Sequence, residues 1–431
     1  MNILVIGSGG REHAFAIELN KSPKCGKLYV APGNAGTAEI AENVDLKITD
    51  FEGIKLFLIS SEIDMLVVGP EEPLVKGICD YIKRDASTKH VLVVGPSAKG
   101  AALEGSKDFS KQFMARNHIP TAAYQTFTKD TFQEGLEYIK NQKLPIVLKA
   151  DGLAAGKGVL ILASHLEAEE SLREMILENK FGEASCTVVV EEFLSGIELS
   201  VFVVTDGKKY KILPEAKDYK RIGEKDSGLN TGGMGAISPV PFADGPFMKK
   251  VEEKIVKPTV EGLIKENIDY KGFLFVGLMN VDGEPYVIEY NARMGDPETQ
   301  AVLPRIKSDF LDLLYSIATG NLQNYTLEID PCATATVVLV AGGYPGSYHK
   351  GDRIQGLDPS ENGRSITFHA GTRADNSGNI LTNGGRVVSV TGKGSNAREA
   401  IAHAYERAKQ IDWDNQYYRR DIGQDILNYG K

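Results

Sequence analysis

The chain has 431 residues and a net charge of −9, with 42% hydrophobic and 25% charged residues. This balance is that of a folded globular protein, and the acidic charge argues against a general role in binding nucleic acid or an anionic membrane surface. The four cysteines are scattered without a CxxC pair, and the sequence has neither a leader pattern nor an apolar run of about 18 residues. We therefore expect a cytoplasmic protein of about three domains.

The first hundred residues alternate short apolar runs with segments of helical character. The expected strands are 2–6, 27–30, 65–68 and 91–94, and the expected crossover helices are 11–19 and 74–84. Apolar strands separated by helical segments predict a parallel sheet that is covered by helices. Residues 1–104 are therefore expected to form an N-terminal α/β domain that binds substrate.

Glycine-containing turns follow the first three of these strands. The first turn, Gly7-Ser8-Gly9-Gly10, opens a helix, and the free N–H groups of a helix start suit an anion. The dinucleotide fingerprint requires a small residue where Glu12 stands, so NAD binding is disfavoured. Turns 32–37 and 69–74 would line the same crevice, because carboxyl ends of parallel strands share one edge. Tight turns without a ligand, or loops that only brace the central domain, are the alternatives.

A second unit begins near Gly105 with a capped helix that starts at Ser106-Lys107-Asp108. Strands are expected at 145–149, 159–163, 187–191, 199–205, 210–213, 272–281 and 285–290, and helices at 166–179, 252–266 and 309–319. The stretch 216–235 is charged and then glycine-rich, which is typical of a mobile loop. We expect one domain over 105–328, with a small lid at about 121–190.

The tail restarts a β pattern from about residue 330. Strands are expected at 335–340, 365–369 and 387–391, and a final helix with an alanine-rich face is expected at 396–410. We therefore expect a β-rich C-terminal domain over 329–431. The predicted fold class is a multidomain α/β and α+β protein with a parallel N-terminal sheet.

The segment Gly152-Leu153-Ala154-Ala155-Gly156-Lys157-Gly158 resembles a phosphate-binding loop. It is one residue short of the P-loop and lacks the Ser or Thr of that motif, which excludes a Walker NTPase. A glycine loop still lets backbone amides approach phosphate oxygens closely. Lys149 ends the β run just before it, as do the lysines that hold nucleotide phosphates in several ATP sites. A structural hairpin is the alternative.

An acidic segment, Glu191-Glu192-Phe193-Leu194-Ser195-Gly196-Ile197-Glu198, follows another apolar strand. Backbone groups beside an apolar side chain can read adenine, and Glu198 can accept hydrogen bonds from ribose hydroxyls. Acidic pairs that simply face solvent are the more ordinary interpretation of such a segment.

The most informative stretch is 285–298, an apolar strand followed by Glu289, Asn291 and Arg293 at every second position. Alternate residues of a strand share one face, so these three side chains point the same way if the strand runs that far. A carboxylate and an amide oxygen are hard ligands suited to Mg²⁺, and an arginine beside them can hold a phosphate. An exposed strand end with ordinary polar residues is the alternative.

Six segments, in this order, resemble the ATP-grasp superfamily and specifically the phosphoribosylamine–glycine ligase (glycinamide ribonucleotide synthetase) family, almost from end to end. They are Gly7-Ser8-Gly9-Gly10-Arg11-Glu12-His13, Pro32-Gly33-Asn34-Ala35-Gly36-Thr37, Gly69-Pro70-Glu71-Glu72-Pro73-Leu74, segment 149–158, Asn230-Thr231-Gly232-Gly233-Met234-Gly235 and Arg293-Met294-Gly295-Asp296-Pro297-Glu298. The resemblance implies a pre-ATP-grasp domain, an ATP-grasp lid and central domain, and ligation of glycine to 5-phosphoribosylamine through a glycyl phosphate. ATP would become ADP and phosphate, in de novo purine biosynthesis.

The same resemblance implies roles for individual residues. Catalytic roles are expected for Lys149, Arg293 and Asp296. ATP binding is expected at Lys107, Lys149, Gly152, Gly156, Gly158, Glu191, Glu192, Phe193, Leu194 and Glu198. Substrate binding is expected at Gly9, Gly10, Asn34, Gly36, Glu72, Pro73, Asp218, Gly232, Gly233, Met234 and Arg293. Glu289 and Asn291 are expected to hold Mg²⁺ or Mn²⁺, with ATP as co-substrate, in a monomer or weak homodimer.

The chain departs from the family pattern in two places. Many members have Gln-Asp-His-Lys where this chain has Lys217-Asp218-Tyr219-Lys220, and a proline at the position of Leu229. Many other ATP-grasp enzymes carry a metal-binding carboxylate one strand earlier, and segment 275–279 offers none. Metal binding would therefore depend on Glu289 and Asn291, with ATP phosphates and water as the other ligands.

Two other functions are weighed against this one. The first is a different ATP-grasp ligase, such as a carboxylase-type purine enzyme, against which segments 9–13 and 293–297 argue. The second is a nucleotide-binding regulatory protein without turnover. Loss of any one of Lys149, Glu289, Asn291 and Arg293 would favour it, and all four are present.

Overall fold

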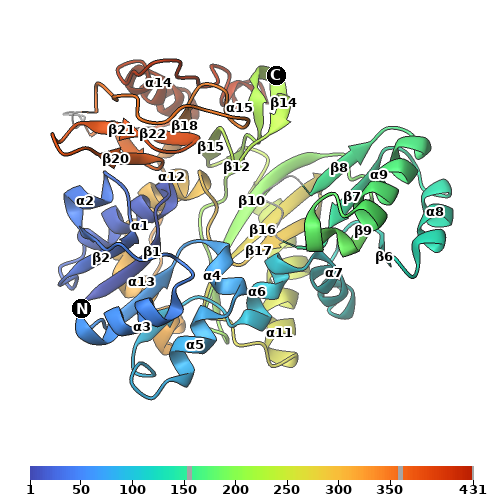
Figure 1. Ribbon diagram of the computed structural model, residues 1–431, viewed down its shortest axis with the longest axis horizontal. Helices are drawn as coiled ribbons and strands as arrows, with labels where there is room; N and C mark the ends of the chain where they lie inside the picture. Colours follow the sequence, from blue (N-terminus) through green and yellow to red (C-terminus); the bar gives the residue numbers. More distant parts are fainter. Residues whose placement is uncertain (153–157, 358–362, 430–431) are drawn as a thin grey trace.

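The computed structural model describes residues 1–152, 158–357 and 363–429 of the chain. Its four larger sheets, with their helices, form four parts that are distinct in Figure 1: an N-terminal part in blue, a lid in green at the right, a central part between them, and a C-terminal part in orange and red at the top. The expected multidomain α/β fold with a parallel N-terminal sheet is confirmed. No helix within the described ranges has the length and apolar character needed to span a bilayer.

The N-terminal sheet is parallel, with the order β3-β2-β1-β4-β5. Its strands are β1 (Ile3–Gly7), β2 (Leu28–Pro32), β3 (Glu42–Asn43), β4 (Met65–Val68) and β5 (Leu92–Val94). Successive side chains of β1 enter two different cores, because strand residues alternate between faces. Ile3 and Val5 pack with α1 (Gly10–Asn20) and with α13 (Phe310–Thr319), which comes from much later in the chain.

The opposite face of this sheet, with Leu4 and Ile6, packs against α3 (Phe51–Ser60) and α5 (Ile78–Arg84). The expected single helix over 74–84 is wrong. Gly77 has a φ of +85°, a left-handed conformation that ends one helix and starts the next, so the segment forms α4 (Glu71–Val75) and α5. The remaining helices of this part are α2 (Thr37–Ile40) and α6 (Ala98–Gly105).

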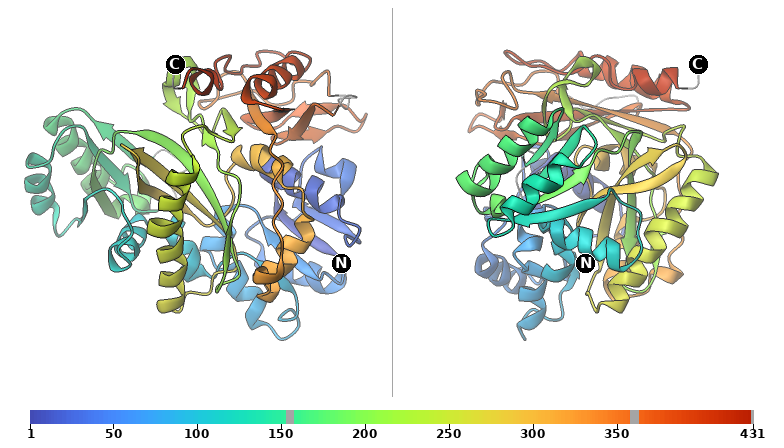
Figure 2. Two further views of the ribbon diagram at one scale, coloured as in Figure 1. Left: turned by 180° about the vertical axis from the view of Figure 1, so that it is seen from behind. Right: turned by 90° about the vertical axis from the view of Figure 1, so that its right-hand side faces the viewer.

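The lid is an antiparallel sheet with the order β6-β9-β7-β8 and two helices on one face. Its elements are β6 (Tyr124–Thr128), α8 (Phe132–Lys140), β7 (Ile146–Ala150), β8 (Val159–Leu162), α9 (His165–Glu178) and β9 (Thr187–Glu192). Leu148 and Val190 pack against the helices. Lys149 and Glu191 therefore lie on the opposite face, which is turned toward the central part (Figure 2).

The central sheet is antiparallel, with the order β11-β10-β16-β17. Its elements are β10 (Ile197–Thr205), β11 (Tyr210–Ile212), β16 (Gly272–Val281) and β17 (Glu284–Asn291), with α7 (Lys107–Arg116), α10 (Gly245–Val251) and α11 (Lys257–Lys265) packed beside it. The expected helix over 252–266 is α-helical only from Lys257, because Glu252–Val256 forms a π-helical turn. Phe202 and Phe275, on the other face, join the core that α13 shares with the N-terminal sheet.

The C-terminal sheet contradicts the expectation of a loop over 216–235. It has the order β12-β15-β18-β22-β19, and its first two strands, β12 (Lys217–Asp218) and β15 (Gly235–Ser238), come from or directly follow that stretch. The others are β18 (Ala333–Val340), β22 (Arg386–Gly394) and β19 (Ser365–His369), with β20 (Thr372–Ala374), β21 (Ile380–Thr382), α14 (Ala397–Ala408) and α15 (Gln424–Asn428) nearby. The sequence does not indicate these strands, because β15 pairs with β18, about a hundred positions later in the chain.

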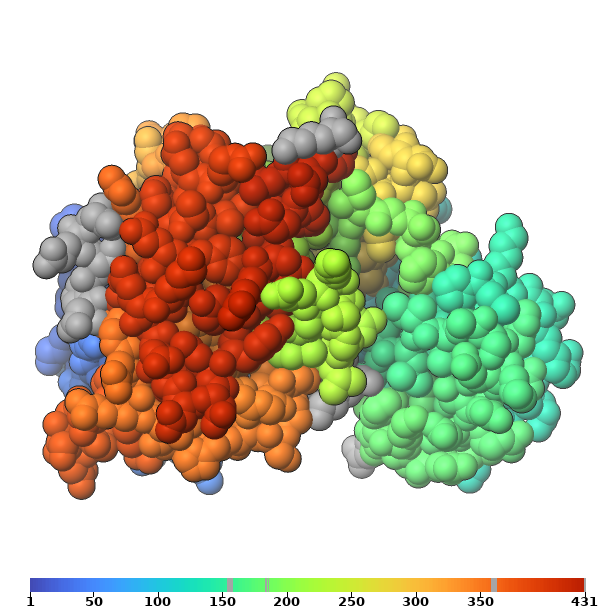
Figure 3. Space-filling view, turned by 90° about the horizontal axis from the view of Figure 1, so that it is seen from above, coloured from blue at the N-terminus to red at the C-terminus, as the bar shows by residue number. Residues whose placement is uncertain are grey.

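The remainder of that stretch forms a hairpin of β13 (Arg221–Gly223) and β14 (Ser227–Asn230), which lies between the C-terminal part and the lid (Figure 3). Arg419, only 1% exposed, holds both its turn and its first strand. Its guanidinium pairs with Asp226 at 2.7 Å and with Asp421 at 2.8 Å, and donates to the Arg221 carbonyl at 3.1 Å. One buried cation thus joins the hairpin to the C-terminal part.

We expect Arg419→Ala to destabilise the protein by about 1–3 kcal/mol, because it removes the charged hydrogen bonds of a buried guanidinium to two partly exposed carboxylates. Hydrogen exchange should rise first in the hairpin 221–230. Arg420→Ala is the matched control, since Arg420 is the next residue in the chain and its side chain is exposed. Unchanged exchange over 221–230 in the Arg419 variant would show that other contacts hold the hairpin.

Candidate active site

The signature stretch begins on β17 and continues beyond it. Glu289 and Asn291 lie two positions apart on this strand and share a face, as expected. The strand ends at Asn291, so Arg293 does not belong to it, and the condition for all three residues to share one strand face is not met. The side chains of Glu289 and Asn291 form no hydrogen bond or ion pair with any described residue, which leaves their oxygens free for a ligand.

Arg293 is held by two carboxylates from the N-terminal part. Its Nη2 lies 2.8 Å from Glu104 Oε1 on α6, and its Nε lies 3.3 Å from Glu71 Oε2 on α4. Glu104 also accepts the backbone N–H of Ala292 at 2.7 Å. The sequence reasoning missed Glu104, which no motif contains, and chose Glu72 rather than its neighbour Glu71. Glu72 is exposed and pairs with Lys76 at 2.7 Å.

Cations surround the Glu289 carboxylate. Burial alone would raise the pKa of Glu289, but Lys220, Lys149, Lys107 and Arg293 hold it below its usual value. The carboxylate therefore stays ionised and is ready to bind a cation, while the surrounding ammonium and guanidinium groups favour an anion beside it. This combination suits a metal–polyphosphate complex.

Two further buried carboxyls lie close to this group. Burial raises the pKa of Glu298, the first residue of α12 (Glu298–Val302), to about 7, and the charge of Asp218 adds to the effect. Burial also raises the pKa of Asp218 to about 6, although Lys220 opposes the shift. Lys220 pairs with Glu198 and lies 4.0 Å from Asp218. Glu298 belongs to the signature segment 293–298, but the sequence alone indicates no separate role for it.

The expected nucleotide residues meet where the lid joins the central part. Lys149 Nζ lies 2.9 Å from Glu191 Oε2 and donates to the Ile288 carbonyl on β17 at 3.2 Å. Lys107 donates to the Gly152 carbonyl at 3.1 Å. Lys111, one turn after Lys107 on α7, also reaches Glu191 Oε2, at 3.1 Å. Sequence reasoning named Lys107 on the same helix but missed Lys111, because Glu191, the partner of Lys111, lies far away in the sequence.

The other expected nucleotide residues are less uniform. Glu192 is exposed and accepts the Ala123 N–H at 2.8 Å, while Phe193 is 40% exposed and Leu194 is half-buried. Glu198 lies on β10 and is engaged by Lys220. Gly158 is buried before β8, and its carbonyl accepts the Ala150 N–H at 2.8 Å. Gly156 lies outside the described residues.

Several expected substrate residues converge at Asp296, where three parts of the fold meet. Its carboxylate accepts the Arg11 N–H at 3.3 Å and the Gln300 amide at 2.9 Å. A Cβ on Gly9 would approach the Asp296 carboxylate, and one on Gly10 would overlap the Gln300 side chain. Burial alone would raise the pKa of Asp296, but the Arg386 and Arg11 guanidinium groups hold it below its usual value.

Arg386, the first residue of β22, brings the C-terminal part to the same junction. Its Nη1 donates to the Asp296 carbonyl at 2.5 Å and to the Gly232 carbonyl at 2.7 Å. Gly233 has a φ of +119°, and a Cβ there would overlap Pro297. Met234 is fully buried behind these glycines. The sequence reasoning had no signal for Arg386, which is distant from every motif.

Other expected substrate residues are occupied by protein contacts. The Asn34 amide donates to the carbonyls of Ser8 and His369, both at 2.9 Å, and its oxygen accepts the N–H groups of Gly36 and Thr37. Gly36 lies against His13 and His369. Pro73 is buried within α4. Asn34 and Gly36 are therefore braced by His369 of the C-terminal part, whereas the alternative interpretation had these loops bracing the central domain.

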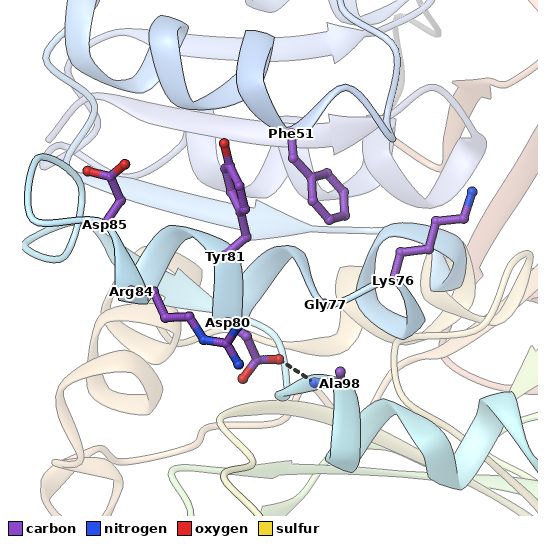
Figure 4. A pocket seen from close by; sticks show the side chains of 8 residues that line it. All are labelled: Phe51, Lys76, Gly77, Asp80, Tyr81, Arg84, Asp85 and Ala98. Atoms are coloured by element: carbon purple, nitrogen blue, oxygen red, sulfur yellow. Dashed lines mark hydrogen bonds between the residues drawn. The ribbon is translucent and has the colours of Figure 1, made fainter.

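A separate open groove of about 560 Å³ lies on the N-terminal part (Figure 4). It is bounded by α3, α5 and the start of α6, with Phe51, Lys76, Tyr81 and Arg84 among its lining residues. None of the expected site residues lines it. The groove is therefore a feature separate from the junction described above.

Comparison with known families matches three consecutive segments of the chain to three domains of one family. These are the phosphoribosylglycinamide synthetase N domain over residues 1–104, the ATP-grasp (A) domain over 105–299 and the C domain over 334–425. Among curated proteins, phosphoribosylamine–glycine ligase of Vibrio vulnificus (strain YJ016) is 46% identical over 426 residues, which cover 98% of each chain. The protein of the same name from Haemophilus influenzae is also 46% identical over 426 residues and 98% of each chain.

Solved structures give the same comparison in three dimensions. Phosphoribosylamine–glycine ligase of Thermotoga maritima superposes with a TM-score of 0.85 at 36% identity, covering 98% of this chain and all of that one. The biotin carboxylase domain of 2-oxoglutarate carboxylase from Hydrogenobacter thermophilus, a complex with MgADP and bicarbonate, has a TM-score of 0.74 at 14% identity, covering 100% of this chain and 99% of that one. The second likeness concerns the fold alone.

The raised pKa of Glu298 makes the stability of the protein depend on pH. The folded protein holds the Glu298 proton up to about pH 7, whereas the unfolded chain loses it near 4.5, so stability declines as pH rises between these values. Above pH 7 the fold carries the full cost of a buried charge. Glu298→Gln removes that cost, so we expect it to stabilise the free protein at pH 8 by on the order of 1–3 kcal/mol, and not at pH 4.5.

The measurement is the melting temperature of wild type and Glu298→Gln at pH 8 and at pH 4.5, without nucleotide and with a chelator. Glu261→Gln serves as the control, because that carboxylate is exposed on α11. An equal effect of Glu298→Gln at both pH values would mean that packing, and not ionisation, causes it.

Proposed function

The chain belongs to the phosphoribosylglycinamide synthetase family, and from that membership we propose how its residues divide the reaction. It is an ATP-dependent carbon–nitrogen ligase that joins glycine to 5-phosphoribosylamine and so makes glycinamide ribonucleotide in purine biosynthesis. The observation that carries the division of roles is the placement of segment 289–298. It presents free ligand oxygens at one end and is bonded to the N-terminal and C-terminal parts at the other.

The chemistry proceeds through glycyl phosphate. A carboxylate oxygen of glycine takes the γ-phosphoryl group of ATP, and ADP leaves. The amino nitrogen of phosphoribosylamine then attacks the acyl carbon, inorganic phosphate leaves, and the nitrogen loses a proton. Phosphoryl transfer needs positioning and charge stabilisation more than covalent participation by the protein. Water must be kept away from the acyl phosphate, which is the role of a lid that closes over the site.

Glu289 and Asn291 would hold the divalent metal, Mg²⁺ or Mn²⁺. The fit rests on two hard oxygen donors on one strand face, neither of them used by another described residue. The described residues contain no cluster of three or more histidine, cysteine or acidic side chains that could enclose a metal, so phosphate oxygens and water would complete the shell. When bound, the metal would neutralise charge on the transferring phosphoryl group.

Lys107 and Lys149 bind the phosphates of ATP, together with the backbone of Gly152, Gly156 and Gly158. Glu191, Glu192, Phe193, Leu194 and Glu198 bind adenosine. The support is the meeting of Lys107, Lys149 and Glu191 at the lid junction. Glu198 would have to exchange its partner Lys220 for the ribose hydroxyls.

Arg293, fixed by Glu71 and Glu104, holds the acyl phosphate, and Asp296 fixes the loop that carries it. Asp218 and the turn Gly232-Gly233-Met234 bind glycine. Phosphoribosylamine lies against Gly9, Gly10, Gly36 and the neighbouring turn of Glu72 and Pro73. Asn34 would lie beside this substrate as well, in the orientation that its hydrogen bonds to Ser8 and His369 give it.

The functional units would be residues 1–104 for the amine substrate, 105–328 for ATP and glycine with a lid at about 121–190, and 329–431 as the C-terminal domain. Strands β12 and β15 extend the last unit beyond its sequence limits. The protein would act in the cytoplasm as a monomer or weak homodimer.

The direct test is ADP release with glycine and freshly generated phosphoribosylamine, each omitted in turn, together with mass detection of glycinamide ribonucleotide. Full ADP release should require both substrates. Rapid ADP release with another amine in place of phosphoribosylamine, or with bicarbonate in place of glycine, would contradict the assignment.

We expect Glu289→Ala to lose turnover by at least about 10²–10³-fold while the protein remains folded, because a preorganised charge at a phosphoryl-transfer site is removed. Mn²⁺ binding in the presence of ATP should weaken in parallel. Glu284→Ala is the matched control, since Glu284 begins the same strand but pairs with Lys250 and Lys254 at the surface. Activity of Glu289→Ala within a few-fold of wild type would rule out the metal assignment.

A further inference from the structure

Lys111 has no role in the division proposed above, yet its side chain is 3% exposed and reaches the nucleotide site. We propose that Lys111 is a positioning residue for ATP: it shares the Glu191 carboxylate with Lys149, so that the Lys149 ammonium is not neutralised and remains available to a phosphate. This inference rests on the proposed placement of ATP phosphates at Lys149.

The geometry is that of two cations on a single oxygen. Lys111 Nζ lies 3.1 Å from Glu191 Oε2, and Lys149 Nζ lies 2.9 Å from the same atom. All three side chains are at most 6% exposed. Lys111 is fixed further by Thr121 Oγ1 at 2.8 Å and stands over the Tyr124 ring. The group is therefore rigid and largely shielded from solvent.

The net charge of these three side chains explains why two lysines accompany one glutamate. Lys111, Lys149 and Glu191 together carry a net charge of +1, which suits a polyphosphate. Without Lys111 the remaining pair would be neutral, and Lys149 would be the only cation for Glu191. Shielding from water makes each of these charges count for more than it would at the surface.

The second oxygen of Glu191 supplies an independent observation. Glu191 Oε1 is buried and has no hydrogen-bond partner among the described residues. A buried acceptor without a donor is costly, and native proteins keep few of them. Because both lysines bind Oε2, they leave Oε1 oriented for an N–H donor that belongs to a ligand.

Lys111 also joins the two connections between the lid and the central part. Thr121 lies where the chain enters the lid from the central part. Glu191 lies at the end of β9, where the chain leaves the lid again. Thr121 in turn donates to the Val287 carbonyl on β17 at 2.7 Å. A purely structural pin between these segments is the competing explanation, and the experiment must separate it from the charge effect.

The experiment measures the affinity of the full-length protein for ATP and for adenosine by calorimetry, with Mg²⁺ and without the other substrates. The variants are Lys111→Met, Glu191→Gln and the double variant. Lys111→Met should weaken ATP binding by about ten- to a hundredfold, which is the loss expected for a charged hydrogen bond. It should weaken adenosine binding much less. The double variant should bind ATP more tightly than Lys111→Met, because Lys149 is again unpaired.

If Lys111 were only a structural pin, the double variant should bind ATP more weakly than Lys111→Met, because the second substitution would remove a further contact. The inference is overturned if the double variant binds ATP no better than Lys111→Met, or if Lys111→Met binds like wild type. Should Lys111→Met fail to fold, Glu191→Gln alone decides. The ratio of its affinity for ATP to its affinity for adenosine must be larger than that of wild type. An unchanged ratio overturns the inference.

Controls separate this inference from the proposed function. Lys99→Met, an exposed lysine on α6, should bind both ligands like wild type. If the wild-type protein bound no ATP, the proposed function itself would fail. If wild type binds ATP and only the order of the variants is wrong, the role of Lys111 alone is refuted.

Discussion

The arrangement of this molecule depends on how segment 293–298 is held. Arg293 is clamped by Glu71 and Glu104 from the N-terminal part, and Asp296 accepts the Arg11 N–H while its own carbonyl accepts from Arg386. These contacts come from three regions distant in sequence. Glu104 is buried and the Arg293 and Asp296 side chains are largely shielded from water, so these charges would be costly without their partners. The segment therefore fixes the relative positions of the parts whose loops form the site.

The site itself is a balance of opposite charges rather than a patch of one sign. Glu289 stays ionised because four cations face it, whereas Glu298 and Asp218 have raised pKa values because burial dominates for them. A ligand that brings both a divalent cation and phosphates can satisfy the two sets together. The free protein thus stores an unfavourable arrangement that its ligands relieve, as functional sites commonly do.

Much of this was predictable from the sequence, and the exceptions have physical causes. Apolar runs located β4 and β16 to the residue, and the spacing of Glu289 and Asn291 placed them on one strand face, because these patterns are local. Lys111, Glu104 and Arg386 were missed, since each acquires its partners only through folding. The stretch 216–235 is predicted as a loop from the sequence alone, because β12 is defined only by its pairing with β15, and β15 by its pairing with β18. Glu71 and Glu72 show the limit of motifs: the motif identified the turn, but not which of two adjacent acids faces inward.

The packing of α13 on the first sheet has a consequence for synthesis of the chain. Ile3 and Val5 face a core completed by Phe310 and Leu314, and Ser22 bonds to Asp309, 287 positions later. On the ribosome, β1 emerges long before the helix that covers it, so one apolar face of the first sheet stays open during translation. Such late closure of non-local contacts slows folding and exposes surface to association. The nascent chain should therefore engage a chaperone through this face until residues 310–319 have left the exit tunnel.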